Sequence, residues 1–152
     1  MQLITQQQIK DFVSSANMAI AGASRNEKSF SADVAKHLAA LNYKLWFVNP
    51  NFDNSEITAH KVRAISDLPE DVKHLLVLTP AIETESVVNQ AIEKGINNIW
   101  IQQKSETTAA IKLAQQNKVN LIHHHCIFMF TKPTGVHKFH RNIKKLFGTL
   151  PR

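Results

Sequence analysis

The sequence predicts an α/β fold in which helices cover a doubly wound parallel sheet of about five strands. Short runs that are apolar on both faces alternate along the chain with segments of helical periodicity. Such strands are typical of parallel sheets whose two faces are both buried. Right-handed crossovers then give a Rossmann-like sheet, most simply with strand order 3-2-1-4-5.

Five apolar runs carry the predicted strands, and proline stops two of them. The runs are 18–23 (MAIAGA), 44–50 (KLWFVNP), 74–80 (HLLVLTP), 97–102 (NNIWIQ) and 119–126 (VNLIHHHC). Pro50 and Pro80 end the second and third runs, because proline cannot donate to a central ladder. The one long irregular stretch, residues 51–70, is expected to hold a short extra strand around residues 61–64.

Four helices are predicted from apolar residues that recur with a helical period. They are 6–15 with Thr5 as its cap, 31–41, Thr84 or Glu85 to 94 with Gly95 at its exit, and a helix capped by Ser105 that runs to about residue 117. One helix precedes the first strand and the others lie between strands, as an alternating fold requires.

Length and composition predict a single domain with a sizeable core. The chain has 152 residues, of which 43% are hydrophobic. No apolar run approaches membrane-spanning length, and the start MQLITQQQIKDF lacks the basic and apolar regions of a secretory signal. Cys126 is the only cysteine, so an internal disulfide is excluded. These features predict a cytoplasmic protein.

The net charge of +6 is concentrated in residues 132–152, which hold six Lys or Arg and no acid. This segment predicts a basic amphipathic helix over residues 136–147, with an apolar stripe of Val136, Phe139, Ile143, Leu146 and Phe147. We expect this extension to pack on a domain of residues 1–131, or on a sister subunit in a homo-oligomer. Binding of nucleic acid or an anionic membrane by its basic face is the alternative.

The candidate ligand site lies at the carboxyl ends of the predicted strands, because ligands of doubly wound sheets bind there. Backbone N–H groups at a helix N-terminus can hold a phosphate at this edge, and basic side chains add charge. The candidates are Gly22, Ala23, Ser24, Arg25, Lys28, Asn49, Pro50, Thr79, Pro80, Gln102 and Gln103. A lone glycine after a strand is more often explained by packing or a turn than by a ligand, and both explanations for Gly22 stay open.

Two features argue against a nicotinamide dinucleotide as the ligand. Its fingerprint has three glycines in the first loop, where this chain has only Gly22. It also has an acid near the end of the second strand, where this chain has the amide of Asn49. The Gly-Lys-Ser/Thr ending of a Walker loop is absent as well.

Several motifs follow one another in a recognisable order. The segment AGASRNEKSFSADVAKHLAALNYKLWFVNPN is followed by EITAHKVRAISDLPEDV, AIEKGINNIWIQ and CIFMF. In this order, residues 12–131 resemble the bacterial CoA-binding domain proteins, which carry a G-x-S-R-N turn and a V-N-P strand end. The resemblance implies the Rossmann-like fold derived above, shared with the N-terminal domain of the succinyl-CoA synthetase alpha subunit.

The resemblance implies a coenzyme A or acyl-CoA ligand held without catalysis. The family's motifs map onto Gly22, Ala23 and Ser24 with Arg25 beside them, onto Val48, Asn49 and Pro50, and onto Thr79, Pro80 and Gln102 at the next two strand ends. Many relatives have a glycine soon after this last Gln, where this chain reads QQKSE. No carboxylate, histidine or cysteine of the matched motifs is expected to be a catalytic group.

Three other functions stay open. Another nucleotide such as NADP would place its extra phosphate on Arg25 and Lys28. The segment 132–152 would bind nucleic acid with the domain as a scaffold. An enzyme would use Cys126 as its nucleophile, which requires a base and an orienting group, and a small buried thiol is the simpler expectation.

The run HHHC at residues 123–126 does not predict a metal site, although His and Cys are zinc ligands. Neighbours on a strand point to opposite faces, so only His123 with His125, or His124 with Cys126, share a side. Two ligands from one strand do not complete a site. We expect strand histidines at a sheet edge or pocket rim.

Overall fold

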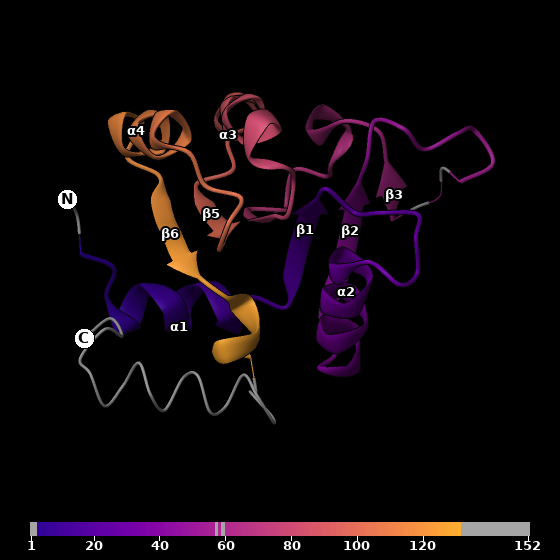
Figure 1. Ribbon diagram of the computed structural model, residues 1–152, viewed down its shortest axis with the longest axis horizontal. Coiled ribbons are helices and arrows are strands. Elements are labelled where there is room, and N and C mark those ends of the chain that lie inside the picture. Colours follow the sequence, from indigo (N-terminus) through magenta and orange to yellow (C-terminus); the bar gives the residue numbers. More distant parts are fainter. Residues whose placement is uncertain (1–2, 57, 59, 132–152) are drawn as a thin grey trace.

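A sheet of six strands forms the middle layer of the protein (Figure 1). The computed structural model describes residues 3–56, 58 and 60–131. The strands are β1 (Asn17–Ala21), β2 (Lys44–Val48), β3 (Lys61–Val62), β4 (His74–Val77), β5 (Asn98–Gln102) and β6 (Asn120–His125). All five pairings between neighbours are parallel, which confirms the predicted α/β class with a doubly wound parallel sheet.

The sheet has one strand more than the five apolar runs, and its order is β3-β2-β1-β4-β5-β6. The predicted order 3-2-1-4-5 places the third apolar run, residues 74–80, beside the second strand. That place is taken instead by β3, the short extra strand expected around residues 61–64, which pairs with the end of β2. The run that begins at His74 is therefore β4, and it lies beside β1. A strand of two residues is too short to give an apolar run of its own, so it could only be suspected from the sequence.

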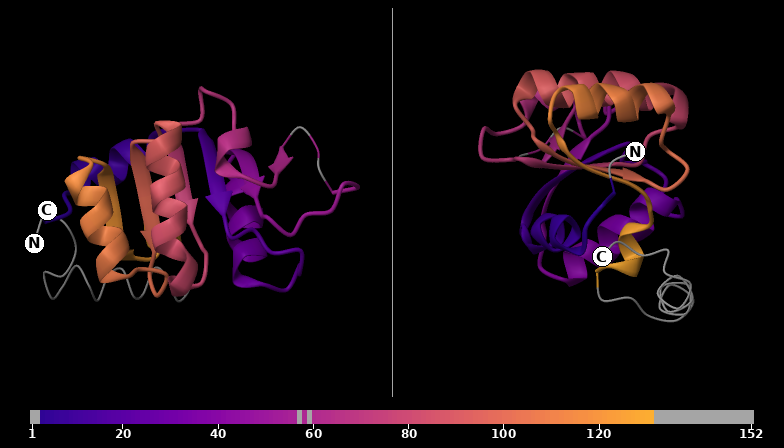
Figure 2. Two further views of the ribbon diagram at one scale, coloured as in Figure 1. Left: turned by 90° about the horizontal axis from the view of Figure 1, so that it is seen from above. Right: turned by 90° about the vertical axis from the view of Figure 1, so that its left-hand side faces the viewer.

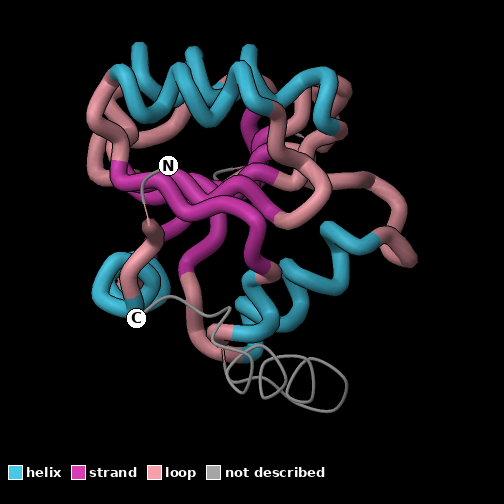
Figure 3. The backbone as a smooth tube through the Cα atoms, turned by 60° about the vertical axis from the view of Figure 1, so that its left-hand side comes forward, coloured by secondary structure: helices cyan, strands magenta, loops and turns pink. Residues whose placement is uncertain are grey.

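Two helices cover each face of the sheet (Figures 2 and 3). Helices α1 (Gln6–Ser14) and α2 (Phe30–Ala40) lie on one face, and α3 (Ala81–Lys94) and α4 (Thr108–Gln116) lie on the other. The short 3₁₀ helix η1 (Ile65–Asp67) packs on the α3 face, and η2 (Ile127–Met129) packs on the α1 face. The result is a three-layer sandwich with two cores.

Strand β1 shows how one strand contributes to both cores. Met18 and Ile20 pack toward α1 and α2, whereas Ala19 and Ala21 pack toward α3 and α4. All four side chains are buried, because successive residues of a central strand point to opposite covered faces. Burial of each large aliphatic side chain contributes roughly 1.5–3 kcal/mol, which explains the doubly apolar strands of the sequence.

The helix starts test the capping predictions. The hydroxyl of Thr5 accepts from the N–H of Gln8, whose side chain accepts from the N–H of Thr5, so the predicted cap of α1 is confirmed. The predicted cap of α4 was wrong. Thr107 caps that helix by accepting from Ala110 N–H at 3.1 Å, whereas Ser105 N–H closes a turn by donating to the carbonyl oxygen of Gln102.

Helix α3 begins at Ala81, earlier than the predicted start at Thr84 or Glu85. Threonine is a residue type that often caps helices. The hydroxyl of Thr84, however, lies 3.0 Å from the Thr79 hydroxyl and is buried inside the first turns of the helix. Pro80 takes the capping position, where its missing N–H costs nothing. The exit at Gly95 is confirmed, since this residue has the left-handed φ of 80°.

The helix predicted over residues 136–147, and with it the packing of residues 132–152, lies outside the described residues. Within the described part of the chain, no helix combines the length and the apolar character needed to cross a membrane.

Candidate functional site

The carboxyl ends of β1, β4 and β5 meet at one edge of the sheet, and the predicted site residues lie along it. The chain leaves β1 for β2 on one side and later enters β4 on the other side, which makes the boundary of β1 and β4 the switch point of the sheet. Two clefts open along this edge, one after β1 and β2 and one after β4 and β5. Most of the predicted site residues line one cleft or the other.

Gly22 follows β1 and brings two turns into contact. Its φ is 86°, and a Cβ atom built on it would lie 2.7 Å from both the carbonyl carbon of Leu78 and the nitrogen of Thr79. No side chain fits there, so the turn after β1 packs directly against the turn after β4. Gly22 lines neither cleft, and the packing explanation of this glycine is the one that the structure supports.

The cleft after β1 and β2 has a volume of about 270 Å³, and we call it the basic cleft. It is lined by Ala23, Ser24, Arg25, Glu27, Ala32, Ala35, Lys36, Phe47, Phe52, Glu56 and Lys61. Its three cations come from the β1–α2 turn, from α2 and from β3, and they outnumber its two carboxylates. Cations gathered from three elements suit an anionic group such as a phosphate.

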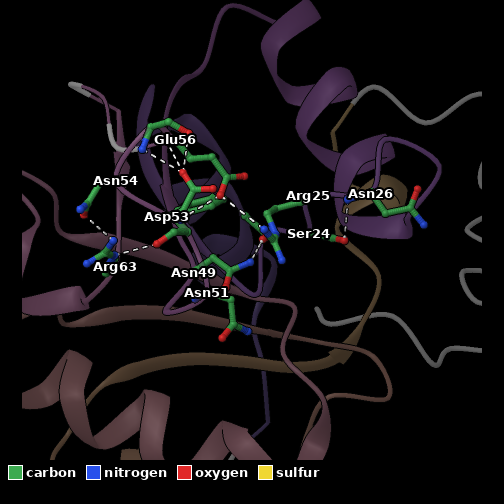
Figure 4. A network of polar contacts seen from close by, with 12 residues as sticks. Ser24, Arg25, Asn26, Asn49, Asn51, Asp53, Asn54, Glu56 and Arg63 are labelled. Carbon is green, nitrogen blue, oxygen red and sulfur yellow. Dashed lines mark hydrogen bonds and ion pairs between the residues drawn. The ribbon is translucent and has the colours of Figure 1, made fainter.

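A polar network surrounds Arg25 (Figure 4). The guanidinium Nη1 of Arg25 lies 3.6 Å from Oε2 of Glu56, and 56% of the Arg25 side chain is exposed. The same Glu56 oxygen accepts from the N–H of Asp53 at 2.9 Å. The Ser55 hydroxyl, with backbone N–H groups and the nearby charge of Arg25, lowers the pKa of the Asp53 carboxyl. The loop before β3 therefore presents carboxylates to Arg25.

Ser24 and Asn49 shape the wall of the basic cleft. Ser24 is exposed, its N–H donates to the Ser31 hydroxyl at 2.9 Å, and its own hydroxyl accepts from Asn26 N–H. The side-chain amide of Asn49 donates to the carbonyl oxygen of Ala23 at 2.7 Å, and its oxygen accepts from Asn51 N–H at 2.8 Å. Asn49 thus joins the two turns, as Figure 4 shows.

Two further predicted residues, besides Gly22, stand apart from both clefts on the surface. Lys28 and Pro50 are exposed, and neither lines the basic cleft or the cleft after β4 and β5. Of the residues predicted on the first two strand ends, the structure brings Ala23, Ser24 and Arg25 together in the basic cleft, with Asn49 behind them.

The cleft after β4 and β5 is larger, about 570 Å³, and we call it the strand-end cleft. It is lined by Phe30, Leu78, Thr79, Pro80, Gln102, Gln103, Lys104, Ser105 and Cys126. Thr79 and Gln102 are buried, and their polar atoms bond the protein: Thr79 to the hydroxyl of Thr84, and Gln102 Oε1 to the N–H of Ile127 at 3.1 Å. The structure therefore brings Thr79, Pro80 and Gln102 together in one cleft.

The turn that closes the strand-end cleft contains a strained residue. Lys104 has a φ of 79°, in the left-handed region that favours glycine. It is the third residue of the turn closed by Ser105 N–H and Gln102 O, where a positive φ is characteristic of glycine. In the segment QQKSE, the backbone therefore adopts at Lys104 a left-handed conformation that suits glycine.

The histidine run does not alternate as a regular strand does. The pairing of β5 with β6 shifts register between Trp100 and Gln102, and His124 has a φ of 59°. His123 and His125 are buried, whereas His124 is exposed and its Nδ1 lies 2.5 Å from Oε1 of Glu106. Cys126 follows the end of β6 and is buried, whereas His124 is exposed.

Burial affects the pKa of the first of these histidines. Burial lowers the pKa of the His123 imidazole, and the neighbouring His124 lowers it further while Glu106 opposes the shift. Across the described residues, no group of three or more His, Cys, Asp or Glu is placed to hold a metal ion.

Several lining residues were not among the predicted site residues. In the basic cleft these include Lys36, Glu56 and Lys61, and in the strand-end cleft Phe30, Lys104, Ser105 and Cys126. Lys36 follows Arg25 and Lys28 in a cationic series that could have been noticed. Lys61 reaches the cleft only because β3 pairs with β2, and no sequence pattern signals that contact.

The family models provide the first comparison with known proteins. Residues 16–132 match the model described as CoA binding domain. The matched range contains both clefts and nearly coincides with the resemblance found in the sequence. No curated protein matches the chain.

Solved structures share the fold. A conserved hypothetical protein from Pyrococcus furiosus is 27% identical, with a TM-score of 0.67 and coverage of 73% of this chain and 95% of that chain. A hypothetical protein from Pyrococcus horikoshii OT3 is 22% identical, with a TM-score of 0.73 and coverage of 84% and 92%. A Thermus thermophilus protein is 20% identical, with a TM-score of 0.73 and coverage of 83% and 96%.

Proposed function

The chain belongs to the CoA binding domain family, and on that premise we propose that it binds coenzyme A or an acyl-CoA along the carboxyl edge of its sheet. The family match over residues 16–132 is the observation that carries the proposal. The two clefts support it, because one is rich in cations and the other is largely apolar. A ligand with a phosphorylated nucleotide at one end and a long thiol-bearing arm at the other suits such a pair.

The basic cleft suits the phosphorylated end of the ligand. Arg25 exposes more than half of its side chain and offers a planar fork of donors to phosphate oxygens. Lys36 and Lys61 add charge from opposite walls, and the exposed hydroxyl of Ser24 adds a hydrogen-bonding group. We assign the phosphates to these four residues.

The strand-end cleft suits the arm of coenzyme A and any acyl group on its sulfur. Phe30, Leu78 and Cys126 give it apolar walls, and Gln103 and Ser105 add polar groups at positions that follow β5. Pockets of 300–1,000 Å³ with few polar groups are typical of small-molecule sites, and a volume of about 570 Å³ lies in that range.

Binding without catalysis is the activity that we propose. The side chains of Thr79 and Gln102 form hydrogen bonds within the protein, to Thr84 and to Ile127. Cys126 is the nucleophile that the cleft offers, and no hydrogen bond joins its thiol to another described residue. A nucleophilic thiol requires a base within hydrogen-bond reach, so the geometry favours a small buried thiol over a catalytic one.

Calorimetric titration with CoA, NAD, NADP and ADP in parallel tests the proposal. We expect CoA to bind most tightly, because Asn49 stands where a dinucleotide-binding protein has an acid for the ribose. Equal or tighter binding of NAD or NADP would contradict it. The same titration with duplex DNA at physiological salt tests the nucleic-acid alternative, for which affinity falls steeply with salt.

Location and assembly complete the proposal. We place the protein in the cytoplasm, where Cys126 and the thiol of the ligand both stay reduced. We further propose that residues 132–152 pack on the domain or on a sister subunit, as their apolar stripe predicts.

A further inference from the structure

We propose that Glu56 occupies Arg25 in the free protein and competes there with the phosphate of the ligand, and so lowers the affinity of the site. The inference rests on the proposed function, because it concerns the site to which the phosphates are assigned. It goes beyond that function by giving the acidic loop before β3 a role in setting the affinity for the ligand.

Arg25 is the cation of the basic cleft that has a carboxylate partner among the described residues. Its Nη1 lies 3.6 Å from Glu56 Oε2. Lys36 Nζ donates instead to the carbonyl oxygen of Glu27 at 3.2 Å, and Lys61 Nζ lies 5.7 Å from the centre of the Phe52 ring. An incoming phosphate therefore meets two cations without a paired carboxylate and one that Glu56 already contacts.

Glu56 is held in place without help from Arg25. Its Oε2 accepts from the Asp53 N–H at 2.9 Å, and its own N–H donates to the carbonyl oxygen and to Oδ1 of Asp53. Ser55 fixes Asp53 in turn, through its N–H and its hydroxyl. Figure 4 shows the Glu56 and Arg25 side chains pointing toward each other. The carboxylate is thus positioned by its own loop and aimed at the guanidinium.

The ion pair is too weak to have a structural purpose. A distance of 3.6 Å is longer than the 2.7–2.9 Å of a charge-assisted hydrogen bond, and exposed pairs of this kind contribute little to folding. Its effect on an anionic ligand is larger, because a phosphate on Arg25 must approach a fixed negative charge. Glu56 therefore lowers the affinity of the site for a ligand whose phosphate binds Arg25.

The variant Glu56→Gln isolates this effect. Its amide oxygen can still accept from the Asp53 N–H, so the loop keeps its hydrogen bond and loses only the charge. Glu27→Gln is the matched control, since Glu27 lines the same cleft and has no ion pair with Arg25 among the described contacts. Calorimetric titration of the full-length wild type and both variants with CoA, at one ionic strength, gives the comparison.

We expect Glu56→Gln to bind CoA about 1.4-fold to fivefold more tightly than the wild type, a range set by the strength of exposed charge pairs. Glu27→Gln should change the affinity less than Glu56→Gln does. Equal gains in the two variants would overturn the inference, since they would reflect net charge alone. Unchanged or weaker binding by Glu56→Gln would also overturn it, and would leave the proposed function standing. Absence of CoA binding by the wild type and both variants would overturn the proposed function and this inference together.

Discussion

The side-chain amide of Asn49 donates a 2.7 Å hydrogen bond to the carbonyl oxygen of Ala23. This bond joins the turn after β2 to the turn after β1, and Ala23 lines the basic cleft. The amide at the end of the second strand is thus a donor that the turn requires. A carboxylate, the group used by dinucleotide-binding proteins near this position, could not replace it.

Asn49→Asp should destabilise the protein. The carboxylate cannot donate to Ala23, and it places two acceptors opposite each other, so we expect the free energy of unfolding to fall by about 1–3 kcal/mol. Urea denaturation followed by circular dichroism measures it. Asn54→Asp is the matched control, because Asn54 accepts from Arg63 Nη2 and a carboxylate keeps that bond. Equal stabilities of the two variants would contradict the assigned role.

Gly22→Ala should be much more damaging than Gly95→Ala. Both glycines have φ near 80°, and each substitution pays roughly 1–2 kcal/mol for a left-handed alanine. A Cβ at Gly22 also meets backbone atoms at 2.7 Å, whereas the nearest atom at Gly95 is the Lys73 amine at 3.9 Å. Thermal melts of the two variants compare these costs. Similar melting temperatures would show that the two turns can move apart.

Arg25→Ala should weaken CoA binding by about 1.5–3 kcal/mol, the usual scale of a hydrogen bond to a charged group. The melting temperature should barely change, because an exposed ion pair contributes little to folding. Lys28→Ala serves as the control, since Lys28 lies nearby in the chain and lines neither cleft. If Lys28→Ala weakens binding as much as Arg25→Ala does, the phosphates lie outside the basic cleft.

Lys104→Gly should stabilise the protein, although it removes a side chain. Lys104 has a left-handed φ of 79°, which costs an ordinary residue roughly 1–2 kcal/mol and glycine little. Part of this gain is offset by the greater freedom of glycine in the unfolded chain, which leaves about 0.5–1 kcal/mol. Urea denaturation measures the difference. A loss of stability would indicate that the Lys104 side chain makes a contact worth more than the strain.

The stability of the protein should fall as the pH drops below the ordinary histidine pKa of about 6.5. Burial lowers the pKa values of His123 and His74, so the unfolded chain binds protons first and unfolding is favoured in acid. Above that pH both states are neutral and the effect disappears. His123→Gln should flatten the pH profile measured by urea denaturation between pH 8 and about pH 5.

The layers of the fold could be predicted because local patterns determine them. Met18 to Ala21 are apolar at every position, and only a strand buried on both faces explains that run. Thr5 and Gln8 form a capping box within one turn of chain, so the start of α1 could be read directly. The start of α4 could not, because Ser105 and Thr107 are both good caps and the turn at Gln102 decides between them.

Residues of the candidate site could be predicted from the sequence only where they lie at or just after the end of a strand. Arg25, Thr79 and Gln102 come after strands, and the parallel sheet alone brings them to one edge. Glu56 and Lys61 reach the basic cleft through the pairing of β3 with β2, a contact that depends on a strand of two residues. Phe30 reaches the strand-end cleft from α2, where its ring packs edge-on against Phe128.

The shortness of β3 has a consequence for amide hydrogen exchange. Strand β1 pairs on both sides and is covered on both faces, so its amide protons exchange only when the whole domain opens. The amides of Phe47 and Asn49 donate to the carbonyl oxygens of His60 and Val62, and they are released by opening the sheet edge alone. The basic cleft is built on that edge through Lys61. A phosphate bound there therefore slows exchange at Phe47 and Asn49, and it slows exchange in β1 as well, because opening the edge and opening the whole domain both disrupt the site.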